Sequence, residues 1–362
     1  MRIHNFGPFS LLALALVPSQ VFGDTCDSVR QLALNKDFVQ SQTIDSPGRY
    51  CLRENLEVKG IFSFGHSPRT SSSIIRISAA EVILDFNSHS ASSDANLEAG
   101  IDTTVSYQPK RRIDNPPKEI VIRNGSIRLT RRGAGVSIVG LGGIANGAPI
   151  SISSDLGWVE NELFHARERA PESGKSAKTL TETTKLEISA AENIRLEMPK
   201  LSEYPNRKIL IENMKIRTRR LGIVIQGADT VIRDSVIEVD SGTAIWLYGP
   251  NSVIENNTII VHGEAEPKVG LFLLEADAPI RLHHGDGALV RNNRIIIAGK
   301  ANRRAISLFD TGPIRVENNT VYGLSKTNEM VKAFLGNVQL SEFGNKFEPT
   351  WKSWFSTWPP RW

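Results

Sequence analysis

The sequence contains little cysteine, few aromatic residues and no long apolar segment in its interior. Cys26 and Cys51 are the only cysteines among 362 residues, and aromatic residues make up 7% of the chain. Two cysteines predict at most one disulfide and argue against a cysteine-based metal or redox centre. Nucleotide-binding loops, catalytic-serine elbows and zinc motifs are also missing. The sequence therefore predicts no cofactor, no metal site and no membrane span.

The charge balance is only mildly basic. The formal net charge is +4 and the pI is about 9.0. This excess is too small to indicate nucleic-acid binding. In an exported protein it fits an anionic polymer as a partner, and it fits an ordinary basic surface equally well.

The N-terminus has the three parts of a secretory signal peptide. Arg2 supplies the positive charge, "FSLLALALV" (Phe9 to Val17) is an apolar run too short to span a bilayer, and "VFG" before Asp24 suits cleavage. Residues 1–23 are therefore excluded from the fold, and we expect a periplasmic or secreted protein.

A six-residue pattern recurs along the rest of the chain: apolar, any, Asn or Asp, any, any, apolar. Successive copies begin 89, 21, 22, 36 and 26 residues apart, so the base unit is 21 to 22 residues. Each unit also holds short segments with apolar residues two apart, which is the alternation of β-strands. One such unit cannot bury its own apolar face, whereas stacked units can. The six copies are "IRNGSI" (Ile122 to Ile127), "IENMKI" (Ile211 to Ile216), "IRDSVI" (Ile232 to Ile237), "IENNTI" (Ile254 to Ile259), "VRNNRI" (Val290 to Ile295) and "VENNTV" (Val316 to Val321).

The central Asn or Asp of the pattern is interpreted as a structural residue. These residue types tolerate the left-handed conformation that a one-residue corner needs. We also expect their side chains to point inward and to form a ladder of hydrogen bonds between units, so that Asn256 is buried and its neighbour Asn257 is not. The predicted ladder is Asn124, Asn213, Asp234, Asn256, Asn292 and Asn318.

The repeat resembles the right-handed parallel β-helix of the pectin-lyase-like superfamily. The resemblance extends from "GRYCLREN" (Gly48 to Asn55) through "VILDFNSHS" (Val82 to Ser90) and "VIRNGSIR" to "VENNTVYG". It implies an all-β, single-domain solenoid over residues 48–348. It does not imply one activity, because the superfamily holds lyases, hydrolases, epimerases and non-catalytic proteins.

Three other segments complete the predicted organisation. Residues 24–47 form an N-terminal cap, in which "CDSVRQLALNKDF" has helical spacing, and a Cys26–Cys51 disulfide would attach the cap to the first coil. A polar, charged stretch at about 155–206 is a long loop insertion. Residues 349–362 are a tail with four of the six tryptophans, which either packs on the solenoid or docks a sugar or partner.

One outward-facing strip is unusually apolar for a surface. If "GIVIQG", "AIWLYG", "VGLFLLE" and "RAISLFD" are equivalent strands, their outward residues form two rows. The rows are Val224, Trp246, Phe272 and Ser307, and Gln226, Tyr248, Leu274 and Phe309. Aromatic rings suit the C–H faces of pyranose rings, but the insertion or the tail can equally cover such a strip. The predicted substrate-binding residues are Arg220, Trp246, Tyr248, Lys268, Phe272, Glu275 and Asp310.

Titratable residues next to this strip suggest chemistry on a uronic acid. Such chemistry needs a cation to neutralise the carboxylate and a base to take the C5 proton. His283, His284 and Arg304 are the candidate catalytic residues, and "ADAPIRLHHGDGA" is expected to be a loop beside the strip. The alternative is a Gly-rich turn with solvated histidines.

Two hypotheses for the function follow. The first is an exported carbohydrate-active protein, a lyase or C5-epimerase acting on an acidic polysaccharide. The second is a non-catalytic polysaccharide-binding or cell-envelope structural protein. The carboxylate clusters of pectate lyases and polygalacturonases and the Asp-Pro-His-Asp stretch of mannuronan epimerases are missing, so no single reaction is favoured.

Overall fold

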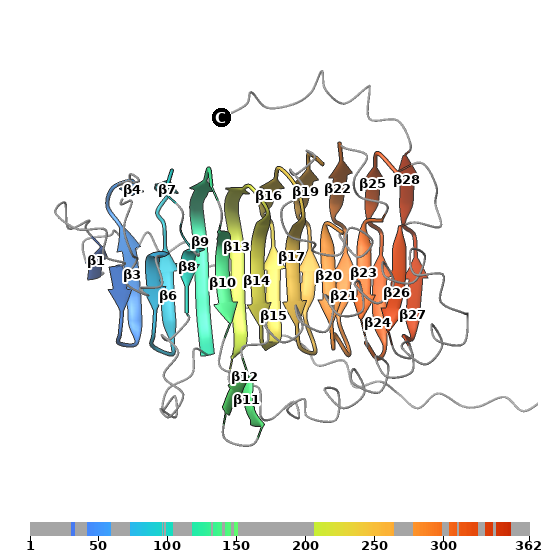
Figure 1. Ribbon diagram of the computed structural model, residues 1–362, viewed down its shortest axis with the longest axis horizontal. Coiled ribbons are helices and arrows are strands. Elements are labelled where there is room, and N and C mark those ends of the chain that lie inside the picture. The colour runs from blue at the N-terminus through green and yellow to red at the C-terminus, as the bar shows by residue number, and fades with distance from the viewer. Residues whose placement is uncertain are drawn as a thin grey trace, which may run out of the picture.

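The computed structural model consists of strands that coil into a parallel β-helix (Figure 1). It describes residues 30–32, 42–58, 73–95, 97, 99–103, 118–131, 133–139, 142–145, 148–150, 206–263, 278–298, 304–309, 311–324, 330–335 and 338–348. In this part of the chain there is no helix, and therefore none that could cross a membrane.

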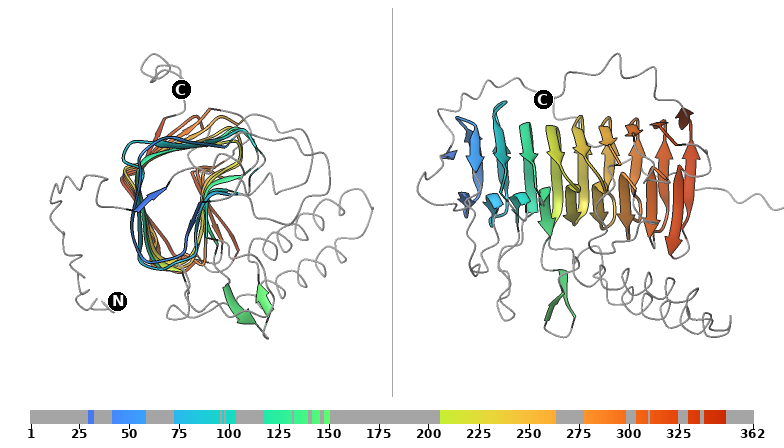
Figure 2. Two further views of the ribbon diagram at one scale, coloured as in Figure 1. Left: turned by 90° about the vertical axis from the view of Figure 1, so that its left-hand side faces the viewer. Right: turned by 45° about the horizontal axis from the view of Figure 1, so that its top comes forward.

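Each turn of the solenoid has three sides, which we call faces 1, 2 and 3. Seen end-on, the strands of successive turns superimpose around one outline (Figure 2, left). Face 1 is a nine-stranded parallel sheet made of β2 (Gln42–Ile44), β5 (Ser73–Ile77), β8 (Ala99–Asp102), β10 (Ala134–Val139), β14 (Leu221–Gln226), β17 (Thr243–Tyr248), β20 (Ile280–His283), β23 (Ile306–Phe309) and β26 (Val331–Leu335).

Faces 2 and 3 are continuous through two long strands, β9 (Lys118–Leu129) and β13 (Arg207–Thr218), which bend from one face to the other. Face 2 also holds β1 (Arg30–Leu32), β3 (Gly48–Leu52), β6 (Val82–Asp85), β15 (Ala228–Arg233), β18 (Val253–Glu255), β21 (Leu289–Arg291), β24 (Ile314–Glu317) and β27 (Leu340–Phe343). Face 3 also holds β4 (Leu56–Val58), β7 (Ser90–Ser93), β16 (Val236–Val239), β19 (Thr258–Val261), β22 (Arg294–Ile297), β25 (Thr320–Tyr322) and β28 (Lys346–Glu348). A separate antiparallel pair, β11 (Gly142–Ala145) and β12 (Ala148–Ile150), follows β10.

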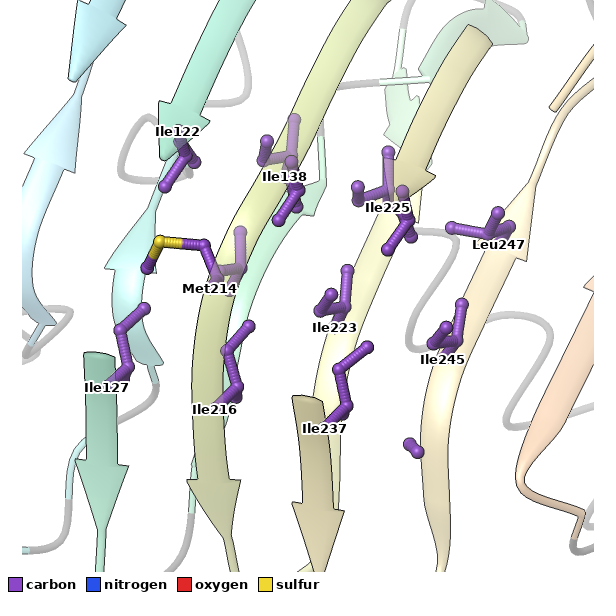
Figure 3. Packing of buried hydrophobic residues seen from close by; sticks show 14 of the residues in the cluster. Ile122, Ile127, Ile138, Met214, Ile216, Ile223, Ile225, Ile237, Ile245 and Leu247 are labelled. Atoms are coloured by element: carbon purple, nitrogen blue, oxygen red, sulfur yellow. The ribbon is translucent and has the colours of Figure 1, made fainter. Parts of the chain in front are cut away.

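The core is a stack of aliphatic side chains inside the coil. In-register pairing places Ile223 beside Ile245 and Ile237 beside Ile259, so like side chains meet from turn to turn. Figure 3 shows such side chains from all three faces pointing into one interior. Each fully buried Ile stabilises the fold by roughly 1.5–3 kcal/mol relative to an exposed one. The alternation of apolar residues in the sequence therefore predicts the core.

A column of small residues lines the start of face 1. Gly135 lies between Gly100 and Gly222 in the register, and Ala244 follows on the next turn. A Cβ atom at Gly222 would lie 2.4 Å from the carbonyl oxygen of Ala244. The close approach of successive turns therefore requires glycine at this position.

The predicted corner between faces 2 and 3 is confirmed, but its predicted side-chain direction is wrong. All six Asn or Asp residues of the pattern have positive φ, between 49° and 59°. Their side chains are exposed, except that of Asn124, which is half-buried. In the left-handed conformation the corner residue turns its side chain outward, and the next residue points into the coil.

The buried ladder consists of these next residues. Asn257 donates from Nδ2 to the carbonyl oxygen of Ile232 (2.9 Å) and accepts at Oδ1 from the backbone N–H of Ser235 (3.0 Å). Asn293 repeats both kinds of bond one turn later, accepting from the N–H of Asn257 (3.0 Å) and donating to Ile254 (2.8 Å). The ladder continues through Asn319 and Asn345.

The structure also corrects the predicted N-terminal helix. Arg30–Leu32 form strand β1, which pairs with β3, instead of a helical turn. Cys26, most of the insertion at about 155–206 and the tail at 349–362 lie outside the described residues. Cys51 is buried in β3, and its disulfide with Cys26 stays a prediction.

The corrected ladder generates a stability prediction. Asn257→Ala removes two hydrogen-bonding groups from a buried column and should lower the free energy of unfolding by about 1–3 kcal/mol. Asn256→Gly is the matched control, because glycine keeps the left-handed corner and the lost side chain is exposed. Urea unfolding of both variants measures the difference. A larger loss for Asn256→Gly would contradict this register.

Candidate functional site

The outward side of face 1 carries two rows of side chains between β14 and β23. Alternation along each strand sends Ile223 and Ile225 inward and Val224 and Gln226 outward. The register then continues each row across the sheet. The Trp246 row is Val224, Trp246, Arg281 and Ser307, and the Tyr248 row is Gln226, Tyr248 and His283. Phe309 lies in register with His283.

The strand assignment at the third position of these rows corrects the sequence prediction. Strand β17 pairs with β20 (Ile280–His283), which therefore takes the place in the sheet that the sequence suggested for the segment around Phe272. The stretch expected to be a loop beside the strip therefore supplies a rung of the sheet. As a result Arg281 and His283 occupy the positions predicted for Phe272 and its neighbour Leu274.

The aromatic side chains of the two rows form one cluster. The ring centroids of Tyr248 and His283 are 4.5 Å apart. Trp246 lies 5.4 Å from Tyr248 and 5.9 Å from His283, measured between centroids. The guanidinium carbon of Arg281 lies 4.4 Å from the centre of the Trp246 ring, a cation–π contact. An aromatic surface, a cation and an imidazole thus meet within two adjacent turns.

The cluster is largely screened from water although it points away from the core. Tyr248, Arg281 and His283 are each 3% exposed and Gln226 is 2% exposed, while Trp246 is half-buried. Electrostatic interactions are stronger in such a dry environment than in water. A charge on a ligand in contact with these groups would therefore be felt strongly.

Two polar groups of the cluster lack hydrogen-bond partners among the described residues. They are the side-chain amide of Gln226, at both Oε1 and Nε2, and the indole Nε1 of Trp246. A buried polar atom without a partner costs about 1–3 kcal/mol, so native proteins rarely leave one unused. These atoms can bind the hydroxyl or carboxylate groups of a ligand.

His283 is held in its neutral form. Burial desolvates the imidazolium and lowers the pKa of His283 well below its usual 6.5, and the positive charges of Arg281 and His284 lower it further. A neutral imidazole can accept a proton, as a general base must.

The other predicted site residues are placed less directly or not at all. His284 is half-buried at the turn that ends β20, with φ 49°. Arg220 and Arg304 lie just before β14 and β23, three turns apart, and Arg304 is buried. His284 follows His283 directly, and its charge lowers the pKa of His283. Four predicted residues lie outside the described part of the chain: Lys268, Phe272, Glu275 and Asp310.

Sequence reasoning did not select Arg281 and Gln226 as site residues, although a usable signal exists. In two neighbouring units the first core residue of face 1 lies nine residues before the first residue of the repeat pattern. These pairs are Ile223 with Ile232 and Ile245 with Ile254. Ile280 lies ten residues before Val290, whereas Leu271 lies nineteen before it. An offset of nine to ten residues identifies Ile280–His283 as the strand of face 1 and its alternate residues as outward-facing.

Comparison with known proteins supports the fold and goes no further. A family model described as "Right handed beta helix region" matches residues 201–339, which hold β13 to β26 and both rows. No curated protein and no solved structure matches the chain.

The low pKa of His283 predicts how stability depends on pH. In the unfolded chain the imidazole binds a proton below about pH 6.5, whereas the folded protein resists protonation. The free energy of unfolding should therefore fall as the pH drops below 6.5, by up to about 1.4 kcal/mol per pH unit from this group. Above pH 6.5 both states are neutral and the contribution vanishes.

The measurement is urea unfolding from pH 8 to pH 5 for the native protein and for His283→Gln. The quantity compared is the slope of the free energy of unfolding against pH. A change in packing caused by the substitution is already present at pH 8 and does not alter this slope. The variant should lose part of the acid-side slope. Equal slopes would show that His283 is not held neutral by the fold.

Proposed function

Because residues 201–339 match the right-handed β-helix family and carry the ring cluster, we propose that the protein is an exported carbohydrate-active β-helix protein. Its reaction is that of a lyase or a C5-epimerase on an acidic polysaccharide, and no cofactor is needed. The observation that carries this proposal is the meeting of Trp246, Tyr248, Arg281 and His283 on one dry surface.

The lyase and the epimerase share their first chemical step. Both reactions remove the proton from C5 of a uronic acid. This proton becomes acidic only when the adjacent carboxylate is neutralised. In the proposed arrangement the guanidinium of Arg281 neutralises this carboxylate. Neutral His283 takes the proton, because its depressed pKa keeps a ring nitrogen available as an acceptor.

The second step decides between the two reactions. In a lyase the electrons of the C5–H bond form a C4–C5 double bond, the C4–O4 bond breaks, and the Tyr248 hydroxyl gives a proton to the leaving oxygen. In an epimerase C5 instead takes a proton from solvent water on the opposite side of the ring. Trp246 would pack on the sugar C–H face in both cases, and the Gln226 amide would bind a hydroxyl or carboxylate group.

The burial of the cluster favours a second candidate function. Arg281, Tyr248 and His283 are almost inaccessible in this structure. That suits a non-catalytic polysaccharide-binding or cell-envelope structural protein, in which the two rows serve packing instead of turnover. The cluster geometry is the reason to place the catalytic function first.

The enzymatic function predicts the behaviour of two variants. His283→Gln and Tyr248→Phe should each reduce turnover of a uronate polymer by about 10²–10⁴-fold, the usual contribution of a general base or acid. His262→Gln, on face 3, is the matched control and should keep full activity. Unsaturated product is followed by ultraviolet absorbance, and deuterium uptake at C5 in heavy water reports epimerisation.

The protein used in this assay should be the exported form, which we expect to begin at Asp24 and to contain one disulfide. Its intact mass checks both features. If no polymer gives product or C5 exchange while a polymer still binds, the non-catalytic function holds. If His283→Gln keeps full turnover, the proposed catalytic role of His283 is wrong.

A further inference from the structure

We propose that a groove on face 3, separate from the ring cluster on face 1, binds a carboxylate-bearing oligosaccharide. The groove has a volume of about 560 Å³ and runs across four adjacent turns. Its walls come from β7, β9, β13 and β16 and from the corners before them. The lining residues used below are Ser90, Ser92, Ser126, Arg128, Lys215 and Arg217.

The register arranges the lining in two rows. One row runs Ser90, Ser126, Lys215 and Val236, and the other runs Ser92, Arg128, Arg217 and Glu238. Serine side chains on β7 and β9 are short, whereas those of arginine and lysine on β9 and β13 are long. This change in side-chain length produces the hollow, with hydroxyl groups on one side and cations on the other.

The cations of the groove are unequally compensated. Arg217 lies 3.6 Å from the Glu238 carboxylate and 3.9 Å from that of Asp240. Glu238 is shared, because its Oε1 also lies 2.7 Å from Nε2 of His262. Arg128 has no hydrogen bond or ion pair with any described residue, and its neighbours in the row are Ser92 and Arg217.

Two arginines on adjacent turns favour an anion between them. Neighbouring strands lie about 4.8 Å apart, so one negative group can approach both guanidinium groups. It would give Arg128 the anionic neighbour that Arg217 already has in Glu238 and Asp240. A guanidinium binds a carboxylate in a bidentate, planar manner, which Lys does not match. The same geometry suits a phosphate, and we choose the carboxylate because this inference rests on the proposed function, whose acidic polysaccharide carries carboxylates.

The serines indicate what carries the carboxylate. Ser90, Ser92 and Ser126 present hydroxyl groups that both donate and accept hydrogen bonds, as the hydroxyl groups of a saccharide require. The spacing of about 4.8 Å between turns is close to the length of one sugar ring. A short uronate chain lying across the turns would meet a hydroxyl or a cation at each residue.

The probe for this groove is trigalacturonate, titrated calorimetrically at low salt into protein that carries Trp246→Ala and Tyr248→Phe, so that neither sugar binding nor turnover at face 1 interferes. Arg128→Ala should weaken binding at least about tenfold and reduce the salt dependence of the affinity. Arg315→Ala, which removes an exposed arginine from β24 on face 2, is the matched control and should leave binding unchanged. Maltotriose, a neutral trisaccharide, should not bind.

A second variant tests the groove without changing its charge. Ser126→Leu fills the hollow and should weaken trigalacturonate binding while the melting temperature stays close to that of the parent. Equal losses in Arg128→Ala and Arg315→Ala would show a net-charge effect only and overturn the proposal. Absence of binding, or equal binding of maltotriose, would also overturn it. Because turnover is measured with His283→Gln and this binding with Arg128→Ala, failure of either proposal leaves the other intact.

Discussion

The in-register stacking of successive turns is the constraint on which the rest of this structure depends. Parallel pairing places each residue over its equivalent on the next turn, so one residue choice is repeated along a whole column. Inside the coil this produces the aliphatic stack and the buried Asn257–Asn293–Asn319 column. Outside, the same rule brings Tyr248 beside His283 and Arg128 beside Arg217, although 35 and 89 residues of sequence separate these pairs.

The repeat predicts the fold because it reports a backbone requirement. Asn or Asp recurs in the six copies since the corner needs positive φ, and that part of the prediction is correct. The burial of these side chains was mispredicted by one residue. The residue after the corner is Gly125, Met214 or Ser235 in the first three copies and asparagine in the last three. This column is therefore less regular in the sequence than the corner itself. The most regular position of the repeat is the corner residue, which needs positive φ. The buried asparagine side chain belongs to the residue that follows it.

The candidate site was only partly predictable for a similar reason. Trp246, Tyr248 and His283, which the sequence suggests as site residues, lie in one cluster. The segment around Phe272, however, has the same apolar alternation as a strand of face 1. Alternation alone cannot decide between the two, whereas the distance to the repeat pattern can. The burial of Arg281 and His283 has no signature in the local sequence, because it depends on residues that are far away along the chain. The helical spacing near Arg30 failed where pairing with β3 offered a strand instead.

Two chemically different surfaces therefore coexist on one scaffold. Face 1 presents rings, an amide and a neutral imidazole in a dry environment, and face 3 presents hydroxyl groups and cations in an open groove. The most direct measurement is a crystal structure of the protein with a uronate trisaccharide bound. We expect a sugar ring against Trp246, its carboxylate on Arg281 and its C5 atom facing His283. A saccharide that nowhere contacts these three residues would contradict the assignment of the functional site to face 1.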